Sequence, residues 1–322
     1  MIHFSTTRNT LLGFLSSIAL VSGLTAMHAQ APAGPRAPAE IPKGYVITPF
    51  GYFHPTCVKQ LGEGDILRED EVAIEHADGS FDSMPACDYP HYDANGERVA
   101  ADPADAPPKI SHSWIEDADA TTATSYGELT GKWKVPPGPT TNHGQTIYFF
   151  PGLEDFKNVT TRTILQPVLG WNSDFIDEWG IASWNCCVKG TTFESSPVSV
   201  KTGDTIYGSM KDTCKAGTLE CSDWNVVSKD ETSGKSTTLR KTSNFKQTFN
   251  WAFGGALEVY NVAKCGDYPS NGSIEFTSLD LYNDKFDKIS NPGWAWQNDS
   301  AKVSPQCSYK GKTTETEVTL EY

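Results

Sequence analysis

One glutamine and two glutamates stand in apolar, strand-like runs of this 322-residue chain. Gln166 lies within Ile164-Leu165-Gln166-Pro167-Val168, Glu258 within Ala256-Leu257-Glu258-Val259-Tyr260, and Glu154 closes the run that begins at Ile147. An amide and a carboxylate can together hydrolyse an amide bond. The carboxylate takes a proton from water, while the amide donates to the developing oxyanion. The alternative for Gln166 is a glutamine hydrogen-bonded inside the core.

Other common chemistries find little support in the residue pattern. The chain has no Gly-x-Ser-x-Gly elbow, no phosphate-binding glycine loop, no Cys-x-x-Cys pair and no His-x-x-x-His helix. Beyond the first 29 residues, four of the five histidines (His54, His76, His91 and His112) lie in the N-terminal region or its link, and only His143 lies in the expected sandwich. Glu275 and Asp280 fall on opposite faces of a strand, which does not indicate a two-carboxylate glycosidase. We expect neither a metal nor a cofactor.

The elements that must position these residues are strands. From residue 111 onward, short runs rich in β-branched and aromatic residues recur between Gly, Pro, Asn, Asp and Ser clusters. The expected strands are Tyr126–Val135, Thr146–Phe150, Thr163–Trp171, Trp179–Cys187, Ser196–Val200, Thr205–Lys211, Asp223–Ser228, Ser236–Phe245, Ala256–Val262, Ser273–Tyr282 and Glu315–Tyr322. The pattern predicts an all-β domain over residues 111–322, an antiparallel β-sandwich of the concanavalin-like jelly-roll kind.

The N-terminal third has a different character. Residues 1–29 predict a secretory signal peptide, with Arg8 followed by the apolar run Leu11–Leu24, so we expect a secreted protein without a membrane anchor. Residues 30–110 comprise a Pro/Ala linker (30–43), strand-like pieces at Tyr45–Phe53 and Glu71–His76, and an acidic link at Ala100–Pro108. This accessory region is either a removable pro-segment or a permanent subdomain.

All eight cysteines lie beyond the signal peptide, and an even count in an exported chain predicts disulfides. We expect Cys57 to pair with Cys87, and Cys265 with Cys307. The middle four (Cys186, Cys187, Cys214 and Cys221) should pair among themselves. Because neighbouring cysteines rarely bridge each other, Cys186 and Cys187 are expected to have different partners.

The charge of the chain narrows the class of partner. The formal net charge is -14. A surface so rich in carboxylates does not suit a nucleic-acid backbone, which is bound by clustered Lys and Arg. It does suit a protein that works in acid, where many carboxylates become neutral.

The order of short motifs along residues ~125–285 resembles that of the eqolisin, or glutamic peptidase, family. The motifs are Gly131-Lys132-Trp133-Lys134-Val135-Pro136, then Phe149-Phe150-Pro151-Gly152-Leu153-Glu154, Ile164-Leu165-Gln166, Ala182-Ser183-Trp184, Thr202-Gly203-Asp204 and Gly255-Ala256-Leu257-Glu258. Neprosin-type peptidases are a second comparison. Nothing before residue 111 is covered by the resemblance.

The resemblance implies a role for individual residues. Gln166 falls on the family's catalytic glutamine and Glu258 on its catalytic glutamate, while Glu154 falls on an aspartate and Phe150 on a substrate-side tryptophan. Trp184 and Trp133 are supporting or substrate-binding candidates; a core position is the alternative for both. The chain departs from the family where Pro167-Val168 replaces Thr-Gly, where Gly170 replaces an acidic residue, and where Val259 replaces a tryptophan.

These observations predict a secreted, acid-acting, monomeric endopeptidase that hydrolyses polypeptides through Gln166 and Glu258. A carboxyl in an apolar groove has a raised pKa, which suits catalysis below neutrality. The alternative from another class is a non-catalytic, carbohydrate-binding sandwich of the lectin type, because exported aromatic-rich β-sandwiches often bind glycans. An inert surface protein is a third possibility. The two side chains must share one face, within one water of a common point, for the peptidase prediction to hold.

Overall fold

The computed structural model describes residues 38, 40–68, 73–84, 86–99, 114–155, 163–173, 176–187, 190–243, 247–300 and 304–322. The predicted signal peptide and the acidic link at Ala100–Pro108 lie outside these ranges. In the described part of the chain almost all regular structure is β-strand, with 3-10 turns at Pro55–Cys57 (η1) and Cys265–Asp267 (η4). None of the helices described there is long and apolar enough to cross a membrane.

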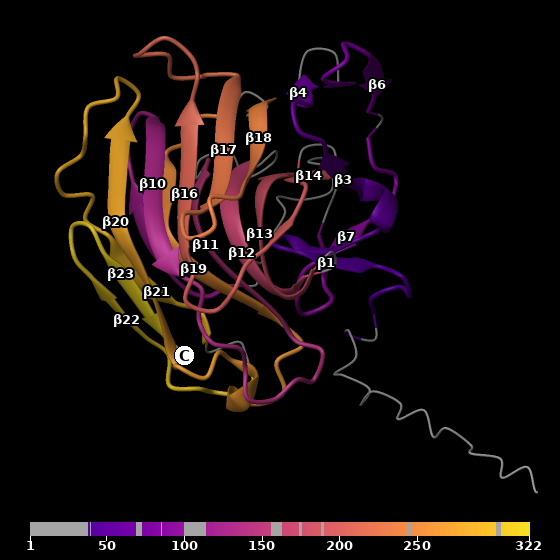
Figure 1. Cartoon of the computed structure of the whole chain (residues 1–322), viewed down its shortest axis with the longest axis vertical. Helices are drawn as coiled ribbons and strands as arrows, with labels where there is room; N and C mark the ends of the chain where they lie inside the picture. Colours follow the sequence, from indigo (N-terminus) through magenta and orange to yellow (C-terminus); the bar gives the residue numbers. More distant parts are fainter. Residues whose placement is uncertain are drawn as a thin grey trace, which may run out of the picture. The chain divides into compact units, whose positions relative to one another are not determined.

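Two large sheets form the sandwich (Figure 1). The nine-stranded sheet carries the residues singled out above, apart from Trp133. Its order is β21 (Ala295–Asn298), β9 (Trp114–Thr121), β19 (Trp251–Tyr260), β11 (Thr146–Glu154), β12 (Ile164–Ser173), β13 (Ile176–Cys186), β14 (Thr192–Ser195) and β3 (Val58–Leu61), with β15 (Val198–Ser199) paired to β13. All pairings in it are antiparallel except β3 with β14.

The facing sheet has ten strands. Its order is β22 (Lys310–Thr313), β23 (Val318–Glu321), β20 (Ser273–Asn283), β10 (Tyr126–Lys134), β16 (Thr205–Asp212), β17 (Asp223–Asp230), β18 (Ser236–Ser243), β4 (Ile66–Arg68), β5 (Ala73–Glu75) and β6 (Phe81–Ser83). A small four-stranded sheet holds β1 (Val46–Thr48), β2 (Gly51–Phe53), β7 (His91–Tyr92) and β8 (Arg98–Val99). The all-β sandwich prediction is confirmed.

Successive side chains along the strands of the nine-stranded sheet point to opposite faces, and both faces are apolar. One face packs against the ten-stranded sheet through residues such as Phe149, Leu165 and Leu257. The other face packs Phe150, Val168 and Ala256 against aromatic residues of the N-terminal region. We call this second face the covered face, and the described residues between 40 and 99 the cover. A sheet buried on both sides needs apolar residues at successive positions, as β11 and β12 have.

Pro167 is accommodated by a glycine on the facing sheet. Pro167 points into the core between the sheets, where a Cβ placed on Gly208 would lie 2.7 Å from its ring and 2.6 Å from the indole of Trp133. Gly208 on β16 therefore leaves the space that these two rigid side chains fill. The unusual proline beside Gln166 thus belongs to the core and points away from the covered face.

Four disulfides account for all eight cysteines. Cys57–Cys87 and Cys265–Cys307 are paired as predicted, and Cys214–Cys221 is the third bridge. The expectation that Cys186 and Cys187 have different partners is wrong, because these neighbours are bonded to each other. The peptide bond between them is cis, and their Cα atoms are 3.1 Å apart.

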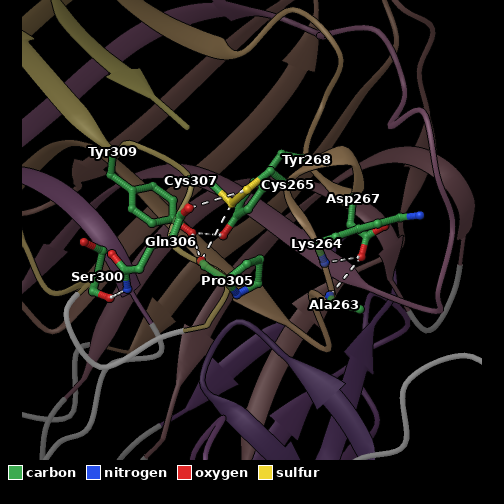
Figure 2. Close-up of a disulfide and its surroundings, with 10 residues drawn as sticks. All are labelled: Ala263, Lys264, Cys265, Asp267, Tyr268, Ser300, Pro305, Gln306, Cys307 and Tyr309. Carbon is green, nitrogen blue, oxygen red and sulfur yellow. Dashed lines mark hydrogen bonds between the residues drawn. A yellow bond between two sulfur atoms is a disulfide. The ribbon is translucent and has the colours of Figure 1, made fainter.

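The Cys265–Cys307 bridge joins η4 to the C-terminal segment (Figure 2). Asp267 accepts hydrogen bonds from the backbone N–H groups of Ala263 and Lys264, which fixes the turn on one side of the bridge. On the other side the Gln306 amide donates to the carbonyl of Ser300. The bridge lies in a chain reversal held by its own hydrogen bonds.

Replacing Gly208 by Ala should destabilise the sandwich by about 1–3 kcal/mol, because the added methyl group overlaps two side chains that cannot move aside. Urea unfolding measures the free energy. The exposed Ser236→Ala in β18 is the control and should change it by less than ~0.5 kcal/mol. An unchanged free energy for Gly208→Ala would mean that the core has room at this point.

Candidate active site

Gln166 and Glu154 are diagonal neighbours on the covered face. Leu153 pairs with Leu165 and Glu154 with Ile164, so the register continues with Gly152 opposite Gln166. In an antiparallel pair such diagonal neighbours are about 7–8 Å apart at Cα, within reach of long side chains. A Cβ placed on Gly152 would lie 2.9 Å from the ring of Phe253 and 3.4 Å from Cγ of Gln166, so glycine lets the Phe253 ring pack closely beside Gln166.

The amide of Gln166 has no hydrogen-bond partner. The residue is fully buried, yet neither its Nε2 nor its Oε1 is bonded within the described part of the chain. A buried amide without partners costs several kcal/mol, and native proteins rarely leave one in that state. The core alternative for Gln166, in which the fold satisfies the amide, is not what the structure has.

A row of side chains extends from Gln166 to the edge of the sheet. Gln166 pairs with Trp184 on β13, and Trp184 pairs with Glu194 on β14. Glu194 is fully buried, and its Oε1 accepts a hydrogen bond of 3.5 Å from the Gln60 amide of the cover. Sequence reasoning missed Glu194. The segment Thr191-Thr192-Phe193-Glu194-Ser195 is largely polar, so the sequence carried no signal that Glu194 would be buried.

Glu258 shares the covered face but lies farther from Gln166. Tyr148 pairs with both Glu258 and Gly170, which places Glu258 two strands from β12 and four residues along it. Four residues correspond to about 13 Å along a strand. Glu258 is buried and accepts a hydrogen bond from the Tyr260 hydroxyl, so it is not the solvent-facing residue of the alternative interpretation. By strand register, Glu154 is therefore the nearer of the two acids to Gln166.

Two aspartates of β9 complete the acidic set on this face, and sequence reasoning missed both. Asp119 pairs with Phe253, which pairs in turn with Gly152, and Asp117 pairs with Ala256. Burial raises the pKa of Asp117 to about 8, with further contributions from the charges of Asp119, Asp299 and Glu154. The alternation Glu-Asp-Ala-Asp-Ala at 116–120 was the available signal for a strand with acids on one side.

Of the remaining predicted residues, Phe150 and Trp184 lie on the covered face and Trp133 does not. Phe150 lies on the covered face, where its ring meets that of Trp114 at 5.7 Å. Trp184 lies on the same face beside Gln166. Trp133 belongs to the other sheet and packs against Phe276 in the core between the sheets, so the structure gives it a packing role away from the site.

The cover closes this face from outside. Tyr148 donates a hydrogen bond from its hydroxyl to the carbonyl of Ile47 at 3.2 Å, and Tyr52 donates from its hydroxyl to Asn261 at 3.2 Å. The ring of Tyr52 also meets that of Tyr260 at 5.4 Å. Strand β3 adds to the edge of β14 in parallel register over residues 58–61 (Figure 1). Gln166, Glu154 and Glu194 are buried on this face, and the cover contacts the sheet at Tyr148, at Tyr260 and along β14.

Comparison with known proteins finds similar folds but no similar sequences. No family model matches the chain, and no curated protein matches it. Among solved structures, the fold is similar to Scytalido-glutamic peptidase with a peptide-based transition-state analogue (14% identity, 65% of this chain, 98% of that chain, TM-score 0.47). It is also similar to SCP-B, a member of the eqolisin family, in complex with the tripeptide Ala-Ile-His (15% identity, 65% of this chain, 98% of that chain, TM-score 0.45). A third similar structure is aspergilloglutamic peptidase from Aspergillus niger (14% identity, 55% of this chain, 98% of that chain, TM-score 0.36).

Assignment of an activity therefore depends on the side chains of the covered face. In the described residues no cluster of three or more His, Cys, Asp or Glu is arranged to hold a metal ion. What the face offers is one unbonded amide, several buried carboxyl groups and aromatic walls. Buried carboxyl groups with displaced pKa values are characteristic of catalytic sites.

The free energy of unfolding should fall as the pH rises from about 4 to about 8. Asp117 keeps its proton in the folded protein up to a pKa of about 8 but loses it near 3.8 when unfolded, so unfolding releases a proton in this window. Glu116, whose pKa burial likewise raises to about 8, acts in the same direction. Denaturant melts across this range should show the decline.

The Asp117→Asn variant should reduce that slope by up to ~1.4 kcal/mol per pH unit, since the group no longer titrates. The exposed Glu275→Gln serves as control and should leave the slope unchanged. A slope for Asp117→Asn equal to that of the wild type would show that Asp117 is ionised in the folded protein.

Proposed function

We propose that this chain is an acid-acting endopeptidase whose site lies on the covered face, with Gln166 as its amide donor. The observation that supports this most strongly is the fully buried Gln166 side chain, which has no hydrogen-bond partner and stands beside a buried carboxylate. The oxyanion that forms when water attacks a peptide carbonyl is a suitable acceptor for Nε2. Secretion of the protein is part of the proposal.

Glu154 is the better-placed carboxylate for the general base. It is the diagonal neighbour of Gln166 on the covered face, and the strand register places it nearer to Gln166 than Glu258 is. In this scheme Glu154 takes a proton from a water molecule, whose oxygen forms a bond to the scissile carbonyl carbon. Nε2 of Gln166 donates to the oxyanion. Protonated Glu154 then gives its proton to the leaving amine as the C–N bond breaks.

The electrostatic surroundings support activity in acid. Asp117, Asp119 and Glu154 share one face, and mutual repulsion disfavours the ionisation of all of them together. A site of this kind gains its working mixture of protonated and ionised carboxyl groups below neutrality.

No observation favours the glycan-binding alternative. A sugar platform requires exposed aromatic rings, but none of the nine tryptophans, all of which are described, is exposed. The exposed large aromatic residues in the described part of the chain, Phe81 and Tyr89, belong to the cover.

Gln166→Ala should lower kcat/KM on a denatured protein substrate at about pH 3–4 by ~10²–10³-fold, the usual cost of losing one oxyanion donor. Glu154→Gln should cause a loss at least as large, because no base remains. Glu258→Gln separates this proposal from the pair predicted by motif order, and should stay within about threefold of the wild type. The exposed Glu275→Gln is the matched control for the amide substitution.

If Glu258→Gln loses all activity while Glu154→Gln stays active, Glu258 and not Glu154 is the general base. Equal activity in Gln166→Ala and wild type would remove Gln166 from the mechanism. Absence of cleavage by every form, once the cover has been released, would overturn the peptidase proposal.

The cover is proposed to be a pro-segment that keeps the site closed. Its own disulfide joins Cys57 to Cys87, and the other three bridges lie within residues 186–307. No disulfide therefore ties the cover to the sandwich. One cut in the backbone between residues 99 and 114 would leave the two parts joined by non-covalent contacts alone.

A chain with a site-specific protease sequence inserted at Ala100–Pro108 should be latent when intact and active when cut. Because the cut pieces dissociate by mass action, activity per molecule should rise as the cut protein is diluted. An uncut chain with the same insertion is the control. Full activity of the intact chain at neutral and acid pH would contradict the pro-segment role.

A further inference from the structure

A phenylalanine of the cover is seated against the tryptophan next to Gln166. The ring of Phe50 meets that of Trp184 edge to face, with centroids 5.9 Å apart. Trp184 is the cross-strand partner of Gln166, and only 3% of its surface is exposed beneath the cover. The apolar wall beside the amide is thus formed by Trp184, together with Ile164 and Ala182 of the same face.

The turn that carries Phe50 is rigid. The hydroxyl of Thr48 accepts a hydrogen bond from the Phe50 N–H at 3.2 Å and donates to the carbonyl of Gly51 at 3.0 Å. Pro49 fixes the backbone before Phe50. Gly51 follows with a φ of +116°, and a Cβ there would lie 2.1 Å from the carbonyl oxygen of Tyr92. Only glycine fits at that position, so the turn presents Phe50 in one orientation.

We propose that Trp184 forms the wall of a substrate subsite for an aromatic or large aliphatic side chain next to the scissile bond, and that Phe50 occupies this subsite in the intact chain. The inference rests on the proposed peptidase function, whose substrate class it names. Edge-to-face contact with an indole favours aromatic side chains beyond the area that they bury. A substrate residue such as Phe, Tyr or Leu would take the place that Phe50 vacates.

The shape of the turn explains why Phe50 can fill the subsite without being cleaved. A peptide that is cut must lie extended, so that its carbonyl carbon reaches the water and the amide donor. Residues 48–51 reverse direction within four residues, and β1 pairs with β2 directly across the turn. Phe50 therefore contacts Trp184 from a tight turn, and its backbone is not the extended strand that cleavage requires.

The first test compares peptide substrates that differ at one residue. The cut form of the inserted-site chain should cleave after or before Phe, Tyr or Leu with a kcat/KM about 10–100-fold higher than for Ala in the same peptide. Trp184→Ala should abolish that ratio chiefly by raising KM for the aromatic peptide, and Trp184→Phe should keep most of it. Cleavage without preference, unchanged by Trp184→Ala, would overturn the subsite and leave the peptidase proposal standing.

The second test does not depend on catalysis. In the full chain, Phe50→Ala opens the space against Trp184, and N-acetyl-phenylalanine amide should then raise the melting temperature of this variant but not of the wild type. N-acetyl-alanine amide is the control probe and should have no effect. Phe50→Val, which keeps more of the packing of the cover, provides the measurement if Phe50→Ala does not fold.

Equal effects of the two probes on the opened variants would overturn the subsite. Selective binding of the phenylalanine amide, with no peptide cleaved by any form, would retain the subsite and exclude the peptidase activity.

Discussion

The nine-stranded sheet is apolar on both faces, and this constraint governs the rest of the molecule. One face is buried by the ten-stranded sheet, as in any sandwich. The other face carries Phe150, Val168, Trp184 and Phe253. The N-terminal strands bury these side chains and so stabilise the intact chain. The candidate site lies at this second interface, where burial and chemistry coincide.

Burial at that interface determines what its polar groups can do. A carboxyl group enclosed between apolar layers holds its proton to a higher pH, as Asp117 does with a pKa of about 8. An amide enclosed without partners is preorganised to donate, since no competing bond must first be broken. Both features carry a cost in stability that a purely structural interface would not need.

Much of the sandwich could be predicted from the sequence because its strands carry β-branched and aromatic runs between turn residues. The prediction Tyr126–Val135 differs from β10 by one residue, whereas Thr146–Phe150 ends four residues before β11 does. Pro151 and Gly152 look like strand breakers in sequence. In the folded sheet Gly152 lies opposite Gln166, and the ring of Phe253 packs against it. Strand β9 was missed because three acids in eight residues (Glu116, Asp117 and Asp119) are typical of a polar link, although the strand is buried.

The site was less predictable, since register decides which residues meet. Motif order paired Gln166 with Glu258, whereas the strand register makes Glu154 the diagonal neighbour of Gln166. The Cys186–Cys187 bridge was missed for a related reason, because a rule about typical geometry was applied to an atypical peptide bond. The contact between Phe50 and Trp184 joins residues 134 positions apart and is not encoded in any local pattern.

The most direct test of the account is a double-mutant cycle between Gln166 and Glu154, measured as kcat/KM at about pH 3–4 on the chain cut between cover and sandwich. If the two residues act on one water and one carbonyl, Gln166→Ala with Glu154→Gln should be little worse than the more damaging single variant. Losses that simply multiply would contradict a shared site. So would a cycle in which Glu258→Gln, and not Glu154→Gln, couples to Gln166→Ala.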